Sequence, residues 1–203
     1  IFVGDVTKAL TLGSAFANVD TVVILTGSFP IQLKNGTFIY EKGATPRDVD
    51  YLGSNNQVLA SLSAKTVQQI ILVSSMGTTH PGSFLDLLGN GFGLSYKLNA
   101  EMYLMQTSIA SNIDFTIVKP SGLLPTTEQG PTNATYLIGH SDCLPECSKI
   151  GSCMAIARND LANVLTISVV NSSLFLNTRF DLSSDIKVPI TKTRDWNMIS
   201  KHI

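Results

Sequence analysis

The chain has 203 residues, of which 44% are hydrophobic and 14% charged, and its formal net charge is −1. This length suits one α/β domain with a real core, and the apolar content excludes a disordered chain. The near-neutral charge argues against nucleic acid as a partner, because a basic surface supplies most of the affinity for it. The aliphatic runs at 22–25 and 70–73 are far shorter than the roughly 20 residues that span a bilayer, so we expect no transmembrane segment.

Short aliphatic segments alternate with helical patterns in the first part of the chain. The expected elements are the end of a buried strand at 1–3, a helix from Thr7 to Asp20, a strand at 21–25, a loop or hairpin at 29–45, a helix from 46 or 47 to 64 and a strand at 69–73. In the helix that ends at Ala64, the residues expected to face inward are Val49, Leu52, Val58, Leu59 and Leu62.

The same alternation continues to the end of the chain. The expected elements are a Gly-rich loop at 78–93, a helix at 95–111, a strand at 115–118, a long irregular stretch that contains the cysteines, a helix at 159–170, a strand near 174–182 and a polar tail from about 183. Strands that alternate with helices indicate βαβ units and a parallel sheet. We therefore predict a single α/β domain over residues 1–203.

The cysteines and histidines do not form a recognisable metal motif. Cys143, Cys147 and Cys153 are spaced C-x3-C-x5-C, without the C-x2-C pairs typical of zinc sites, so no metal is expected. One local disulfide with a spare thiol and three reduced thiols both remain open. The histidines (His80, His140 and His202) are scattered and are interpreted as surface residues, and Trp196 is an anchor against either the domain or a partner.

Several strings of the sequence, taken in order, resemble one protein family. They are Gly4-Asp5, Val22–Gly27, Val49–Gly53 with Asn56, Leu72–Gly77, Lys97–Glu101, Lys119–Leu123 and Ile156–Ala162. Together they are similar to the atypical short-chain dehydrogenase/reductase proteins of the NmrA-like, NAD(P)-binding kind, particularly those of plant and algal plastids. The resemblance implies a Rossmann-like, doubly wound parallel sheet.

In that family an N-terminal βαβ unit carries a Gly-rich loop that holds the pyrophosphate of the dinucleotide. No such loop occurs in residues 1–203, so we expect the N-terminal strands to be missing from this chain and the sequence to be a fragment. The implied cofactor is NADP, with NAD as the alternative. Its binding is conditional on the Gly-rich loop being present elsewhere.

The resemblance also implies which residues contact the cofactor. Asp5 corresponds to an adenine contact, although it is equally suited to cap the helix that starts near Thr7. The turn 26–28 corresponds to the loop beside the adenine ribose, and the turn 120–123 to the one beside the nicotinamide. The cofactor-binding candidates are Asp5, Val6, Thr26, Gly27, Ser28, Ser74, Lys97, Pro120, Ser121, Gly122 and Leu123.

The catalytic candidates are Ser75 and Lys97, again by resemblance. The family's Lys binds the nicotinamide ribose and lowers the pKa of a proton-donating Tyr four residues earlier. That position is Gly93 here, and Tyr96 is next to the Lys on the helix, so ordinary carbonyl reduction is in doubt. Ser74 and Ser75 are equally suited to be small turn residues. Arg158 and Asp160 are interpreted as an ion pair at a helix start.

Two functions follow from the resemblance. One is an NAD(P)-binding oxidoreductase that acts on a small organic substrate. The other is a non-catalytic structural, assembly or redox-sensing subunit of a larger complex, since plastid relatives include a component of the inner-envelope protein translocon. Protein subunits of a membrane complex are therefore implied partners beside the dinucleotide. A plastid location is implied, with mitochondrion and cytoplasm as alternatives.

Overall fold

The computed structural model describes residues 1–124, 134–142 and 155–189, and for 185–189 the backbone alone. All three cysteines, Trp196 and His202 lie outside these ranges, so the predictions about them are untested. The chain divides into two compact units: one contains Ile1–Leu72 and Gly77–Phe115, and the other Val73–Met76 and the residues from Thr116 onward. Each unit is described by itself.

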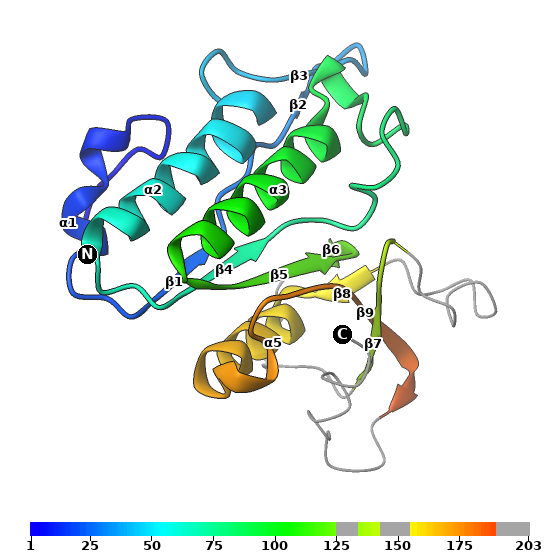
Figure 1. The fold of residues 1–203 in the computed structure, drawn as a ribbon. Coiled ribbons are helices and arrows are strands. Elements are labelled where there is room, and N and C mark those ends of the chain that lie inside the picture. Colours follow the sequence, from blue (N-terminus) through cyan, green and yellow to red (C-terminus); the bar gives the residue numbers. More distant parts are fainter. Residues whose placement is uncertain (125–133, 143–154, 190–203) are drawn as a thin grey trace. The chain divides into compact units, whose positions relative to one another are not determined.

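The first unit contains two parallel strands, a short hairpin and two long helices (Figure 1). Its elements are η1 (Ala9–Thr11), α1 (Gly13–Phe16), β1 (Thr21–Ile24), β2 (Ile31–Gln32), β3 (Phe38–Ile39), η2 (Arg47–Gly53), α2 (Ser54–Ala64), β4 (Gln69–Val73), η3 (Leu88–Asn90) and α3 (Gly93–Ser111). The β1 and β4 strands pair from Thr21↔Gln69 to Ile24↔Leu72, and their continuous apolar runs are typical of buried parallel strands.

The segment before β1 differs from the prediction. Residues Ile1–Val3 form no strand and all three side chains are exposed, because the described part of the chain places no strand beside them to pair with. The helix expected from Thr7 is shortened to η1 and α1. Leu12 and Phe16 are buried, whereas Leu10 is fully exposed.

The predicted hairpin and the helix after it are present, but the helix buries the wrong face. β2 and β3 pair antiparallel on either side of Asn35-Gly36. The helix begins as a π-helix, η2, and continues as α2 beside α3 (Figure 1). Val58 is buried as expected, whereas Leu52 and Leu59 are exposed. The buried face instead contains the polar side chains of Asp50, Ser54, Gln57 and Ser61.

The second unit is built on β5 (Asp114–Pro120) and β9 (Thr178–Pro189), which are parallel from Thr116↔Thr178 to Pro120↔Leu182. Its other elements are β6 (Gly122–Leu124), β7 (Ala134–Gly139), β8 (Ala155–Ala157), α5 (Arg158–Val170) and η4 (Ser172–Leu174). β7 pairs antiparallel with β9, and β6 pairs parallel with β8. The chain therefore has an α/β fold with mainly parallel strands, as predicted.

Three boundaries in the second unit are corrected. The region expected to be irregular contains β6, β7 and β8, and the strand expected near 174–182 is β9, which starts later and continues to Pro189. The first residues of the predicted polar tail, 183–189, therefore belong to β9. Short strands such as β6 and β8 are formed by pairing with distant residues, which a local sequence pattern does not reveal.

Candidate functional site

A buried carboxylate in the first unit connects three segments that are far apart in the sequence. Asp50 Oδ1 lies 2.5 Å from Lys97 Nζ, and the side chain of Asp50 is 1% exposed against 23% for Lys97. The other carboxylate oxygen accepts hydrogen bonds from the backbone N–H of Ser28, at 3.1 Å, and from the Ser28 hydroxyl. We define Ser28, Asp50 and Lys97 as the Asp50 cluster.

Three elements position this cluster. Ser28 lies in the turn that follows β1, which places it at the carboxyl end of a parallel strand, where open α/β sheets bind their ligands. Asp50 is in the π-helix η2, a rare form that is frequently found at functional sites. Lys97 is in the second turn of α3.

Gly27 leaves the approach to the cluster open. A Cβ atom at this position would lie 3.4 Å from Asp50 Oδ1 and 3.5 Å from Lys97 Nζ. A side chain at this position would therefore stand in van der Waals contact with both charged groups. The absence of a side chain permits a ligand to approach the backbone of the turn and the lysine together.

The turn after β1 is also held by the polar face of α2. Gln57 Nε2 donates a hydrogen bond of 2.9 Å to Thr26 Oγ1 and a second one to the Gly53 carbonyl. These bonds give the buried Gln57 amide partners, which is why a polar side chain can occupy this position. The predicted turn 26–28 is thus fixed from η2 and α2.

Asp5 and Val6 come close to the same helix. Asn56 Nδ2 donates to the Val6 carbonyl at 2.8 Å, and Val6 packs where Gly53 has no Cβ. The Asp5 carboxylate accepts hydrogen bonds from the Thr7 backbone and hydroxyl, which together with Lys8 lower the pKa of Asp5 to about 2. Asp5 therefore caps the turn at Thr7, and its adenine contact stays a prediction.

A second buried aspartate caps α3. Asp86 accepts hydrogen bonds from the Ser95 backbone and hydroxyl and from the Gly82 backbone. Burial alone would raise the pKa of Asp86, but these bonds stabilise the carboxylate and hold the pKa below its usual value. The cap pins the start of the helix that carries Lys97.

The position four residues before Lys97 is Gly93, the first residue of α3, as the sequence predicts. Tyr96 does not join the Asp50 cluster: its ring stacks on that of Tyr51, with centroids 6.2 Å apart. The two tyrosines connect α3 with η2 beside the ion pair. Tyr96 is therefore a packing residue of this helix pair.

The remaining predicted site residues lie in the second unit. Ser74 is buried and its backbone N–H donates to the Val118 carbonyl, while the Ser75 hydroxyl donates to the Met76 carbonyl. Ser121 donates its backbone N–H to Leu182 and shares a side-chain hydrogen bond with Ser183. Their neighbours in the predicted set are the buried Pro120 and the exposed Gly122 and Leu123. The roles predicted for these residues remain predictions.

Sequence reasoning missed a second charged cluster, which lies in the second unit. Lys119 Nζ is 2.5 Å from Asp142 Oδ1 and 3.2 Å from Asp181 Oδ1, and the lysine side chain is fully buried. At the start of α5, Arg158 and Asp160 have separate partners in place of the expected mutual ion pair. Arg158 donates to the Leu124 carbonyl, and Asp160 accepts from the Tyr136 hydroxyl.

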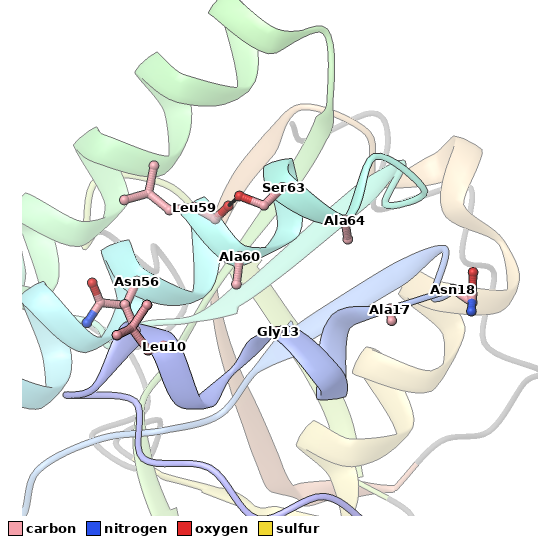
Figure 2. A pocket seen from close by; sticks show the side chains of 10 residues that line it. Leu10, Gly13, Ala17, Asn18, Asn56, Leu59, Ala60, Ser63 and Ala64 are labelled. Carbon is pink, nitrogen blue, oxygen red and sulfur yellow. Dashed lines mark hydrogen bonds between the residues drawn. The ribbon is translucent and has the colours of Figure 1, made fainter.

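A shallow hollow of about 550 Å³ lies on another face of the first unit (Figure 2). Its walls are mostly small or apolar side chains of α2 and of the segment 9–18. It contains none of the predicted site residues, and Asn56, which lines it, is already bonded to Val6. Within the described residues, no group of acidic, histidine or cysteine side chains is arranged to bind a metal.

Asp50 is the site residue that sequence reasoning overlooked. It belongs to the string Val49–Gly53 that carries the family resemblance, but no role was assigned to it. One feature of the sequence could have indicated its role: Asp50 is a charged residue inside the helix expected to end at Ala64, and it is not one of the residues expected to face inward. Its partners, Ser28 and Lys97, could not be identified from local spacing.

Comparison with known proteins identifies the family of this chain. A family described as NAD(P)H-binding matches residues 1–171. An uncharacterized chloroplast protein of Arabidopsis thaliana is 34% identical over 98% of this chain and 60% of its own length. Sanguinarine reductase of Eschscholzia californica is 31% identical over 100% of the chain and 79% of its own length. The chloroplast protein TIC 62 of Pisum sativum is 30% identical over 92% of the chain, which spans 32% of that protein.

Solved structures show the same fold. A putative NAD-dependent epimerase/dehydratase from Bacillus halodurans superposes with a TM-score of 0.67 at 20% identity, covering 99% of this chain and 77% of that one. A short-chain dehydrogenase/reductase from Veillonella parvula in complex with NADP gives 0.58 at 16% identity, covering 88% and 69%. In the part of the chain that the structure describes, no helix is long and apolar enough to cross a membrane. The chain belongs to the NAD(P)H-binding family and has its Rossmann-like fold, as the resemblance predicted.

Proposed function

We propose that the chain is part of an NADPH-dependent reductase that acts on a small organic molecule. The observation that carries the proposal is the Asp50 cluster: a lysine ammonium fixed by a buried carboxylate at the carboxyl end of β1, beside a glycine that leaves it open. Sanguinarine reductase, 31% identical over the whole chain, supports a reductase of this kind. NADPH is proposed before NADH on the family resemblance.

The residues at this place fit a nicotinamide dinucleotide. Lys97 has its ammonium beside Gly27, where a Cβ would close the approach, and the Ser28 backbone and hydroxyl already show that the turn can donate hydrogen bonds. When bound, the dinucleotide supplies a hydride. Lys97 would donate hydrogen bonds to its sugar hydroxyls, the Ser28 hydroxyl oxygen, whose own proton goes to Asp50, would accept one, and Asp50 would fix the position of the lysine.

The proposal is tested by titrating the purified protein with NADPH and, separately, with NADH. Lys97→Ala removes the cation and should weaken NADPH binding at least about 10-fold, the scale of a charge-assisted hydrogen bond. Tyr96→Phe keeps the stacked ring and should leave the affinity nearly unchanged. Equal effects of the two substitutions, or no binding by the unchanged protein, would overturn the assignment.

A second function is favoured by Gly93, which stands where the family's proton-donating tyrosine is expected. With no side chain there, the protein would bind the dinucleotide without reducing a substrate and act as a subunit of a larger assembly. The relative TIC 62, together with the resemblance to plastid complex subunits, supports this alternative. Oxidation of NADPH in the presence of sanguinarine separates the two: turnover supports the reductase, and binding without turnover supports the subunit.

A plastid location belongs to the same proposal, because the Arabidopsis and pea relatives are chloroplast proteins. We also propose that residues 1–203 form a single functional domain. Its protein partners would be subunits of a plastid complex. Fractionation of chloroplasts followed by immunodetection tests the location. Recovery of the protein outside the plastid fraction would contradict it.

A further inference from the structure

Tyr40, the residue after β3, lies against the glycine-containing segment that leads into α3. A Cβ atom on Gly91 would be 2.8 Å from Tyr40 Cζ and 3.0 Å from Pro46 Cγ, which is too close for any residue but glycine. A Cβ on Gly89 would be 3.1 Å from Tyr40 Cε2. The aromatic ring therefore rests directly on backbone, and the sequence of this segment leaves room for it.

The hydroxyl of Tyr40 points toward the start of α3. It lies 3.8 Å from the place where a Cβ of Gly93 would be. Gly93 and Lys97 are four residues apart in this helix, so they share one face, with about 5–6 Å between neighbouring Cβ positions. The phenol thus occupies the helix face that carries Lys97, at a position where α3 itself supplies no side chain.

The surroundings of the Tyr40 hydroxyl determine whether it can donate a hydrogen bond to a ligand. Burial raises the pKa of Tyr40, and the negative charges of Asp50 and Asp86 raise it further. The phenol consequently keeps its proton near neutral pH and can donate a hydrogen bond. Within the described residues the Tyr40 hydroxyl forms no hydrogen bond to protein, so this capacity is available to a ligand.

The two carboxylates also discriminate between the parts of a dinucleotide. Asp86 repels phosphate groups, and the charge of Asp50 is already paired with Lys97, so an uncharged group is favoured beside Tyr40. The ribose and the carboxamide of the nicotinamide half are uncharged hydrogen-bonding groups. The nicotinamide half therefore suits this position, and the phosphorylated adenosine half does not.

We propose that the Tyr40 hydroxyl is a ligand-binding group for the nicotinamide–ribose half of the dinucleotide, supplied by the β2–β3 hairpin beside Lys97. The inference rests on the proposed function, because it names the part of the same ligand that the site holds at this point. The Tyr40 hydroxyl would contact the ligand directly. Gly89 and Gly91 would position the Tyr40 ring, because they leave space for it against the backbone.

The test compares two ligands on the purified protein: NADPH, and adenosine 2′,5′-bisphosphate, which lacks the nicotinamide half. Tyr40→Phe keeps the ring but removes the hydroxyl, so NADPH should bind about 2- to 10-fold more weakly, the value of one neutral hydrogen bond. Binding of the bisphosphate should not change. Tyr51→Phe, a tyrosine of η2 that stacks on Tyr96, is the matched control and should affect neither ligand.

A second variant tests whether the packing of the Tyr40 ring on Gly91 positions the hydroxyl. Gly91→Ala displaces Tyr40 and should produce the same selective loss for NADPH, whereas Gly13→Ala, with open space around its Cβ, should not. Unchanged NADPH affinity in Tyr40→Phe, or an equal loss for both ligands, would overturn the inference while leaving the proposed function intact. An unchanged protein that binds neither ligand would overturn both.

Discussion

The carboxylate of Asp50 reaches Ser28 and Lys97 from the π-helix η2, which packs against α3. A buried carboxylate without partners would be costly, since a charge loses its hydration on burial. Here one oxygen is paired with the lysine and the other with a backbone N–H and a hydroxyl. Both oxygens of the carboxylate therefore have partners at the point where we propose that the dinucleotide binds.

Asp5 provides a prediction at the scale of single residues. Its pKa in the folded protein is about 2, below the ordinary value of 3.8, because of hydrogen bonds from Thr7 and Lys8. A lowered folded-state pKa gives stability that is present above pH 3.8 and is lost as the pH falls through 2. A carboxyl NMR titration should therefore find Asp5 titrating near 2, and Thr7→Val should return its pKa toward the ordinary value.

Thr37→Val, the same substitution at an exposed threonine of the hairpin, is the matched control and should leave the Asp5 titration unchanged. An Asp5 pKa near 4 in the unchanged protein would contradict the capping geometry. Because the Asp5 side chain is 43% exposed, solvent screens its interactions and the stability that they contribute is small.

At the scale of elements, the helix formed by η2 and α2 shows how tertiary partners override an apolar pattern. Its leucines at 52 and 59 are exposed, while Gln57 and Ser61 are buried. The polar face is turned inward because Thr26 and the backbone carbonyls of the helix itself accept its hydrogen bonds. The spacing of apolar residues identifies the helix, but it does not determine which face of the helix is buried.

Lys119, Asp142 and Asp181 form the Lys119 cluster, which gives a prediction at this scale. The cluster connects β5 and β9 with Asp142, which lies in the turn after β7. Lys119 and Asp181 are partners in the parallel register of β5 and β9. Lys119→Met leaves two buried carboxylates without their cation and should lower the free energy of unfolding by about 3–5 kcal/mol. Urea denaturation measures the change.

Lys34→Met is the matched control, because Lys34 is exposed in the hairpin, and it should change stability by less than about 0.5 kcal/mol. Near-equal stability of the Lys119 and Lys34 variants would show that the buried ion pairs contribute little. Both oxygens of Asp181 lack hydrogen-bond partners among the described residues, which makes this carboxylate especially dependent on the lysine.

At the scale of the whole molecule, binding of NADPH should stabilise the chain. A ligand at about 100 times its Kd adds about 2.7 kcal/mol to the folded state when it binds that state alone. In a chain of 203 residues this corresponds to a rise in Tm of roughly 5–10 °C, which a thermal-shift measurement detects. The rise should be smaller for Lys97→Ala at the same NADPH concentration, and an absence of any rise would contradict dinucleotide binding.

The sequence by itself determined the alternation of the main strands and helices, the α/β class and the NAD(P)H-binding family, because short apolar runs and the strings around Gly27, Gly77 and Lys97 are local signals. It also located Lys97 and the glycine at 93. Only the tertiary structure revealed Asp50 as the partner of Lys97, Tyr40 beside Gly93 and the buried Lys119 cluster. Their contacts join residues tens of positions apart, and the geometry that pairs them exists only after the strands and helices have packed.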